Sequence, residues 1–402
     1  MPAFFGTRIV RAAFLLAILG WGIGFYGPPV FLHAVIARTG WPLEWVSAAV
    51  TLHFISGVLV VANLPRLYRR LGLPVVTTGG AVLLAAGVTG WALAAAPWQL
   101  ALAAMLSGVG WVTMGAAAIN AIVTPWFRRK RPAALSTAYN GASIGGVILS
   151  PLWVLAIDRL GFTGAAIAIC GTAVVLTGWL SVSVFAKTPE SLGQHPDGDA
   201  APLAETEPVQ VVGVHLRLRR DARFLTLAAG MALGLFAQIG MVAHLFTVLA
   251  PRIGGQEAGL AMGLATAAAI GGRMVAVRIL GLGISRRSLA AGSYAVQAAG
   301  VLLFLAAGES VALTLSAILL FGSGIGNATS LPPLIAQAEF SPATVQRVVP
   351  LIVAIGQASY AFAPAAYGLV RTSFFGDPGF FVAVALVQLL ALLCFLIGRR
   401  AA

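Results

Sequence analysis

The sequence of 402 residues is poor in charged side chains, because Asp, Glu, Lys and Arg together make up only 9% of it. Lysine occurs only at Lys130 and Lys187, and the only two cysteines, Cys170 and Cys394, lie apart in apolar runs. Two isolated cysteines exclude a disulfide framework and a cysteine-rich metal site. With 59% hydrophobic residues, the composition also excludes an ordinary soluble globular domain.

Acidic residues are especially scarce, and all twelve fall in or beside the loops predicted below. The apolar runs contain no nucleotide-binding loop, no nucleophile elbow and no cluster of His, Cys and carboxylate side chains. We therefore expect no enzymatic activity, no metal and no cofactor.

Long apolar runs recur from one end of the sequence to the other, and each can cross the roughly 30 Å hydrocarbon layer as a helix. The first run lacks a signal-peptide cleavage pattern, so we expect it to be retained. We predict an all-α membrane protein whose twelve spans lie at about 12–36, 43–64, 74–95, 98–123, 133–157, 162–186, 224–249, 257–280, 288–307, 310–337, 346–370 and 377–397.

The basic residues divide unequally between the two sides of these spans. Nineteen of the 25 fall on one side and four on the other, while Arg273 and Arg278 lie within a span. This asymmetry follows the positive-inside rule. It predicts a multi-pass protein of the cytoplasmic membrane with both termini in the cytoplasm. The net charge of +13 therefore needs no nucleic-acid partner to explain it.

The one long polar segment divides the chain into two similar halves. We predict a six-helix bundle over 1–186, a flexible cytoplasmic linker over 187–222 and a second six-helix bundle over 223–402. An offset of 210 places Phe14 on Phe224 and Gly20 on Gly230, and an offset of 213 places Pro151 on Pro364. A parallel repeat of this kind is typical of the major facilitator fold.

Arg273 is the one residue around which a site can be predicted. It lies within the apolar span 257–280, where a guanidinium costs roughly 3 kcal/mol on insertion scales. Such a cation needs a partner or a wet cavity. Thr266, Ala269 and Ala276 share its face of the helix and are expected to leave room for a ligand. The alternative is pairing with groups of the protein itself, and Arg278 is expected to be an interface arginine.

Other polar residues within the spans are candidates for the same site. His53 could couple transport to protons, since imidazole titrates near neutral pH, or it could be a neutral histidine hydrogen-bonded between helices. Tyr26 precedes Pro28 and Pro29, which are expected to break the first helix. His244 lies near the outer end of its span, where solvation at the membrane interface would suffice. The remaining substrate-binding candidates are Asn140, Gln238, Asn327, Gln357 and Tyr360.

A motif between the fourth and fifth spans carries a family resemblance. Residues 120–133 read Asn-Ala-Ile-Val-Thr-Pro-Trp-Phe-Arg-Arg-Lys-Arg-Pro-Ala, and Asn140-Gly-Ala-Ser-Ile-Gly-Gly follows. This resembles the monocarboxylate porter and oxalate/formate antiporter branch of the major facilitator superfamily. The resemblance implies the twelve-helix fold and an arginine of helix 8 that binds the substrate carboxylate. Arg273 matches that arginine.

Three positions depart from the family pattern. Ala269 stands where some relatives carry an aspartate, which puts proton coupling through an acid in doubt. Both lysines are outside the spans, so a second cation in helix 11 is lacking. Arg69 occupies the usual place of an aspartate in the loop after the second span.

We therefore predict a monomeric secondary active transporter that moves a small organic anion, most simply a monocarboxylate, by alternating access. Protons are the expected coupling ion if transport is coupled. The alternative is an efflux transporter for apolar or cationic compounds, which would be expected to carry a buried acid. A solute sensor would need a soluble signalling domain, and an anion channel would not need the two-fold repeat.

Overall fold

The computed structural model describes residues 4–61, 63–199, 218–373 and 375–401, and every regular element in these ranges is helical. The chain forms two compact units, Met1–Thr206 and Glu207–Ala402. The boundary predicted between the halves, at 187–222, stays a prediction.

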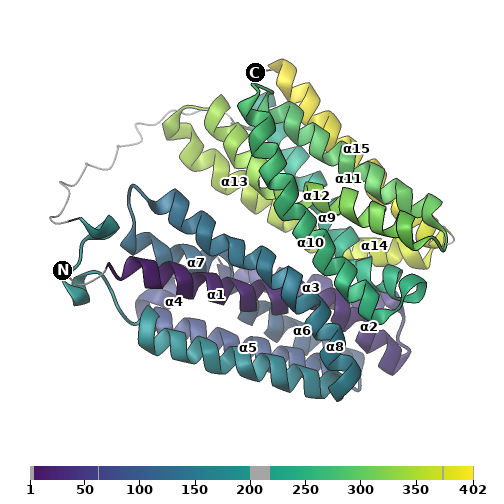
Figure 1. The fold of residues 1–402 in the computed structure, drawn as a ribbon, viewed down its shortest axis with the longest axis horizontal. Helices are drawn as coiled ribbons and strands as arrows, with labels where there is room; N and C mark the ends of the chain where they lie inside the picture. The colour runs from purple at the N-terminus through teal and green to yellow at the C-terminus, as the bar shows by residue number, and fades with distance from the viewer. Residues whose placement is uncertain (1–3, 62, 200–217, 374, 402) are drawn as a thin grey trace. The chain divides into compact units, whose positions relative to one another are not determined.

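Unit 1 holds the elements drawn from purple to teal in Figure 1. These elements are α1 (Gly6–Gly24), α2 (Gly27–Thr39), α3 (Leu43–Val61), α4 (Leu64–Leu71), α5 (Leu73–Leu93), α6 (Pro97–Val112), α7 (Ala116–Val123), η1 (Thr124–Trp126), α8 (Arg131–Leu180), η2 (Ser181–Phe185), η3 (Glu190–Leu192) and η4 (Pro196–Gly198).

Unit 2 holds the elements drawn from teal-green to yellow. These elements are η5 (Leu218–Arg220), α9 (Ala222–Ile253), α10 (Gly255–Gly281), α11 (Arg286–Ala307), α12 (Val311–Glu339), α13 (Pro342–Ala361), α14 (Ala363–Thr372) and α15 (Gly376–Ala401). Within this unit α9 packs against α10, α12 and α13, and α12 packs against α10.

The helices agree with the twelve predicted spans. In the described residues, ten helical segments are long and apolar enough to cross a membrane, and Leu43–Val58 is a shorter apolar helix. One of the ten, Arg131–Phe185, contains the two spans predicted at 133–157 and 162–186. Gly161 separates them, because its φ of 70° is a left-handed conformation that a helix cannot contain. The all-α fold with twelve spans is thus confirmed.

The predicted break in the first span is also confirmed. Helix α1 ends at Gly24 and α2 begins at Gly27. Pro28 and Pro29 occupy the first turn of α2, where a missing N–H is tolerated. The break leaves carbonyl groups at the end of α1, that of Gly24 among them, without their helical donors.

Residues 187–199, predicted as part of a flexible linker, belong to unit 1 and pack against the rest of it. The Asp197 side chain accepts hydrogen bonds from the backbone N–H groups of Arg128 (3.2 Å), Arg129 (2.8 Å) and Lys130 (3.2 Å). Asp197 is only 5% exposed. We call residues 187–199 the strap; the rest of the predicted linker up to Arg217 lies outside the described residues.

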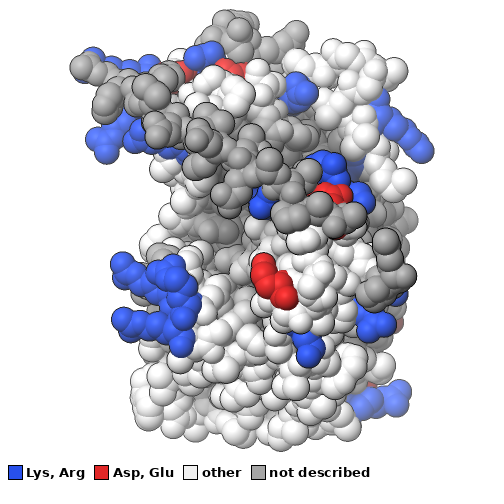
Figure 2. Space-filling view, turned by 90° about the vertical axis from the view of Figure 1, so that its left-hand side faces the viewer, with Lys and Arg blue, Asp and Glu red and all other residues white. Residues whose placement is uncertain are grey.

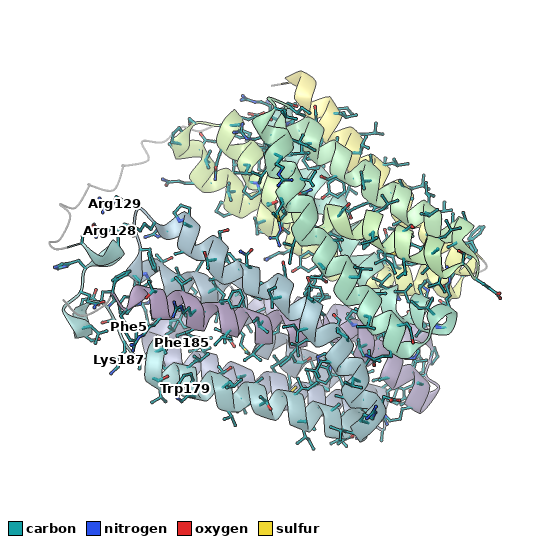
Figure 3. All side chains as sticks on the ribbon, viewed as in Figure 1. Phe5, Arg128, Arg129, Trp179, Phe185 and Lys187 are labelled. Carbon is teal, nitrogen blue, oxygen red and sulfur yellow. The ribbon has the colours of Figure 1, made fainter. Side chains whose placement is uncertain are left out.

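The strap also holds the beginning of the chain. The backbone N–H of Phe5 donates to Gln194 Oε1 at 2.9 Å, and the Phe5 ring lies 5.5 Å from that of Trp126. Phe5, Arg128 and Arg129 lie at the same end of unit 1 as Lys187, with which the strap begins (Figure 3). Three segments far apart in the sequence are therefore joined at this end.

The hydrogen bonds to Asp197 shift its titration. Burial alone would raise the pKa of the Asp197 carboxyl, but the three N–H donors and the Arg129 guanidinium together hold this pKa below its usual value. The resulting stabilisation is fully present above the unfolded-state pKa of about 3.9 and is lost as pH falls through the lower folded-state pKa.

Asp197→Asn should lower the stability of the folded protein at pH 7 by roughly 1–3 kcal/mol, because the variant places an amide where three N–H donors need an anionic acceptor. Thermal unfolding in detergent, measured from pH 7 to pH 3, should show the wild-type advantage narrowing below pH 4. Asp199→Asn is the control, since the partner of Asp199 among the described residues is the exposed side chain of Arg129. Equal losses in both variants would contradict the assigned role of Asp197.

Candidate functional site

Arg273 lies on α10, eight residues before this helix ends at Gly281, and therefore about 12 Å from that end. Its neighbours Met274, Val275 and Val277 are apolar and 58%, 51% and 69% exposed in the structure. The Arg273 side chain itself is half-buried. The cation thus lies within the span, nearer to the end of α10 than to the beginning.

The Arg273 side chain lies across a glycine of the neighbouring helix α12. A Cβ atom at Gly326 would lie 2.7 Å from Arg273 Cγ, 2.8 Å from Arg273 Nε and 2.6 Å from the Ala269 carbonyl oxygen. Position 326 therefore has no room for a side chain unless its neighbours move. Gly272 is similarly close to the Ser323 carbonyl. These two glycines let α10 and α12 approach closely, and Gly326 determines where the guanidinium can lie.

The expectation that small residues leave room beside Arg273 is wrong. Thr266, Ala269 and Ala276 are only 2%, 2% and 4% exposed. Ala269 faces Gly326 of α12, and Ala276 belongs to the apolar core of unit 2. The small face of α10 therefore serves helix packing.

The other candidates of unit 2 lie on α9, α12 and α13, and both α9 and α13 pack against α12. Gln238 of α9 is 3% exposed, and its Oε1 has no hydrogen-bond partner among the described residues. Asn327 of α12 donates from Nδ2 to Ser293 Oγ of α11 at 3.0 Å. Gln357 and Tyr360 of α13 are half-buried. Their roles as substrate contacts stay predictions.

The candidates of unit 1 lie apart from one another on different helices. Tyr26 stands at the α1–α2 break with its ring edge-on to Phe25 at 5.0 Å, and Asn140 is exposed on α8. Beside Asn140, the Tyr139 hydroxyl donates to the Ala116 carbonyl at 3.0 Å and receives a hydrogen bond from the Asn120 amide. This Asn120–Tyr139 pair was missed, although Asn120 begins the motif that carries the family resemblance and Tyr139 directly precedes its second part.

His53 has a hydrogen-bond partner at each ring nitrogen. Nδ1 lies 2.8 Å from Ser107 Oγ, and Nε2 lies 2.8 Å from the Gly24 carbonyl oxygen. Pro28 is four residues after Gly24 and has no N–H to donate to that carbonyl. An Nε2–H on His53 satisfies it instead. These contacts favour the structural alternative for His53, while proton coupling stays a prediction.

His244 is fully buried, so solvation at the membrane interface does not account for it. Its Nε2 lies 2.9 Å from the Pro364 carbonyl oxygen at the start of α14, and Arg371 Nη1 lies 3.4 Å from its Nδ1. Arg371 in turn donates to Asp377 at 2.7 Å. The charged pair Arg371–Asp377 was not predicted. Arg371 lies in the predicted loop between the last two spans and Asp377 is the first residue of the last span, and sequence position alone does not show that they meet.

In the described ranges no group of three or more His, Cys, Asp and Glu side chains is arranged to hold a metal ion.

Gly326→Ala should destabilise unit 2 by about 1–3 kcal/mol, because the added methyl group overlaps Arg273 and the Ala269 carbonyl and must push α10 and α12 apart. Gly271→Ala is the matched control on the same pair of helices, since nothing lies within 4 Å of a Cβ atom at Gly271. It should be neutral or slightly stabilising. Thermal unfolding of the two variants checks this, and equal stability of Gly326→Ala and Gly271→Ala would contradict the packing.

Solved structures of membrane transporters share this fold. A mutant of the nucleoside transporter NupG superposes with a TM-score of 0.73 at 11% identity, over 97% of this chain and 99% of that one. A bacterial homolog of the human lysosomal transporter Spinster, inward-facing and occupied, also gives 0.73, at 12% identity over 100% and 98%. At these identities the likeness concerns the fold alone.

The sequence comparisons agree. The MFS transporter asaE of Aspergillus flavus is 26% identical over 197 residues, which are 48% of this chain and 43% of that protein. The chain thus spans less than half the length of this relative. The sequence pattern of the Major Facilitator Superfamily matches residues 12–364, which is nearly the whole chain. The protein is therefore a multi-pass membrane transporter, not an enzyme, and it belongs to the major facilitator superfamily.

Proposed function

We propose that this transporter moves a small organic anion, and that a monocarboxylate binds to Arg273 during alternating access of the two halves. The observation that carries the proposal is the position of Arg273, which lies within a span with its side chain across the bare backbone of Gly326. A guanidinium held in one place can give a carboxylate two parallel hydrogen bonds.

The distribution of charge supports an anion over a cation. In the described part of unit 2, acidic residues stand at helix ends or between helices, whereas Arg273 lies well inside α10. These acids are Asp221, Glu257, Glu309, Glu339 and Asp377. A cationic substrate would meet a fixed positive charge in α10 and no carboxylate at the same depth. This argues against the efflux of cationic compounds.

The resemblance to the monocarboxylate porter branch supports the carboxylate in particular. It rests on the motif from Asn120 to Ala133 and on Arg273 at the place of the family's helix 8 arginine. One of the transporters of similar fold is named for nucleosides, but at 11% identity its substrate carries no weight for this chain.

We further propose which groups complete the substrate site. Gln238 is the strongest candidate after Arg273, because its buried Oε1 needs a donor that the described residues do not supply. Gln357 and Tyr360, half-buried on α13, can donate hydrogen bonds without adding charge. Asn327 is weaker, since its amide already donates to Ser293. We also propose Tyr26 and Asn140 of unit 1 as substrate contacts.

The proposed orientation follows from the basic residues. With nineteen of them on one side of the spans and four on the other, both termini are assigned to the cytoplasm of a cell-membrane protein. Under this assignment the strap, the beginning of α1 and the beginning of α9 are cytoplasmic. We propose that the protein works as a monomer.

Arg273→Lys should weaken substrate binding about ten- to a hundredfold, because the ammonium keeps the charge but loses the planar pair of donors. Arg273→Ala should abolish uptake. The measurement is uptake of a panel of radiolabelled monocarboxylates into proteoliposomes.

Arg278 supplies the control for this experiment. It lies five residues further along α10, is exposed, and falls on a different face of the helix. Arg278→Lys and Arg278→Ala should retain uptake. Wild-type uptake by Arg273→Ala of every carboxylate that the wild type transports would refute the anion site.

The proposed site should prefer a monoanion to a dianion of similar size by at least about 1.4 kcal/mol, or roughly tenfold, because a second carboxylate would be desolvated without a partner. Competition between a monocarboxylate and a dicarboxylate of matched length, in the same vesicles, measures this preference. Equal or tighter binding of the dicarboxylate would mean that a second cation, Arg278 first among them, reaches the substrate.

A further inference from the structure

A second basic site lies in unit 2, where the beginnings of α9 and α13 meet the short helix η5. A cavity of about 620 Å³ opens there, and neither Arg273 nor any other residue of α10 lines it. Three arginines and four apolar side chains line it: Leu218, Arg219, Arg220, Phe224, Arg347, Leu351 and Ile355. We call it the basic groove.

The groove is polar at one end and apolar along its length. Arg347, Leu351 and Ile355 follow one another at intervals of four residues, so they lie along one face of α13. From Arg347 to Ile355 this face extends about 12 Å along the helix. Leu351 and Ile355 are 38% and 39% exposed, so they form an accessible apolar strip that continues along α13 from Arg347.

The described acids at this end of unit 2 pair with arginines that do not line the groove. Asp221 pairs with Arg223 at 3.1 Å, and Glu339 pairs with Arg287 at 2.6 Å. Arg219, Arg220 and Arg347 are exposed, and none of them forms an ion pair with a carboxylate of the described residues. The groove therefore offers three guanidinium groups to an anion from outside the protein.

The position of the groove points to the membrane itself as the source of that anion. Helices α9 and α13 both begin a span here, so the groove lies where headgroups meet the hydrocarbon layer. Figure 2, turned so that the left-hand side of Figure 1 faces the viewer, shows Lys and Arg in separate blue groups. Basic residues at a membrane surface attract anionic lipids.

We propose that the basic groove binds an anionic phospholipid. The phosphate accepts hydrogen bonds from Arg219, Arg220 and Arg347, and an acyl chain lies along Leu351 and Ile355. Phosphate is well matched to clustered guanidinium groups. Basic residues at span ends are required by membrane orientation alone, but orientation does not require a cavity or an apolar strip in line with one of the arginines.

The test measures lipid binding to the purified full-length protein in detergent, by native mass spectrometry with added phosphatidylglycerol or with phosphatidylcholine of the same chains. We expect at least about tenfold tighter binding of phosphatidylglycerol, with a preference that declines as salt is added. Arg219→Gln, Arg220→Gln and Arg347→Gln together should remove at least about tenfold of that affinity. The same three positions changed to Lys should retain most of it, which separates loss of charge from misfolding.

Two controls make the test specific. Arg66→Gln, Arg69→Gln and Arg70→Gln remove the same charge from α4 of unit 1 and should leave binding unchanged. Leu351→Gln with Ile355→Gln should weaken phosphatidylglycerol several-fold while leaving glycerol phosphate, which lacks acyl chains, unaffected. Glycerol phosphate and inorganic phosphate should bind far more weakly than the lipid.

Three results would overturn the proposal: equal binding of the two lipids, an equal loss from the α4 variant, or inorganic phosphate binding as tightly as phosphatidylglycerol. The last would identify a site for a soluble anion instead. None of these measurements depends on transport, so they are independent of the substrate proposed for Arg273.

Discussion

Hydrocarbon offers no hydrogen bonds, and this constraint governs every polar group that the protein places within its spans. The break between α1 and α2 removes the donor of the Gly24 carbonyl, and a ring nitrogen of His53 takes its place. The break between α13 and α14 has a similar neighbour, since His244 lies against the Pro364 carbonyl. In each unit, a histidine from another helix thus meets the backbone beside a proline that interrupts a span.

The same constraint explains why Arg273 and Gly326 belong together. An arginine in a span must be directed to a particular place, and the missing side chain of Gly326 gives its stem a path across α12. The packing of α10 against α12 and the position of the Arg273 charge therefore depend on each other, and a substitution at Gly326 would also displace Arg273. Small residues between membrane helices commonly allow close packing, and here they also position a cation.

The sequence predicted the fold well, because the length of an apolar run and the asymmetry of basic loops follow directly from the membrane. The turn at Gly161 and the break before Gly27 were predictable from Gly and Pro themselves. The site was less predictable. That Thr266, Ala269 and Ala276 pack against neighbouring helices, and that Asp197 accepts three backbone N–H groups, depends on partners distant in sequence. The lengths and positions of the apolar runs do not show which helices pack against each other.

The strap shortens the tether between the two halves. A connection from Lys187 to Ala222 could extend to roughly 120 Å, whereas the stretch from Asp199, held beside Arg129, to Leu218 reaches at most about 65 Å. A shorter tether raises the effective concentration of one half near the other. The contacts of Asp197 and Gln194 therefore shorten the connection between the two halves, in addition to stabilising unit 1.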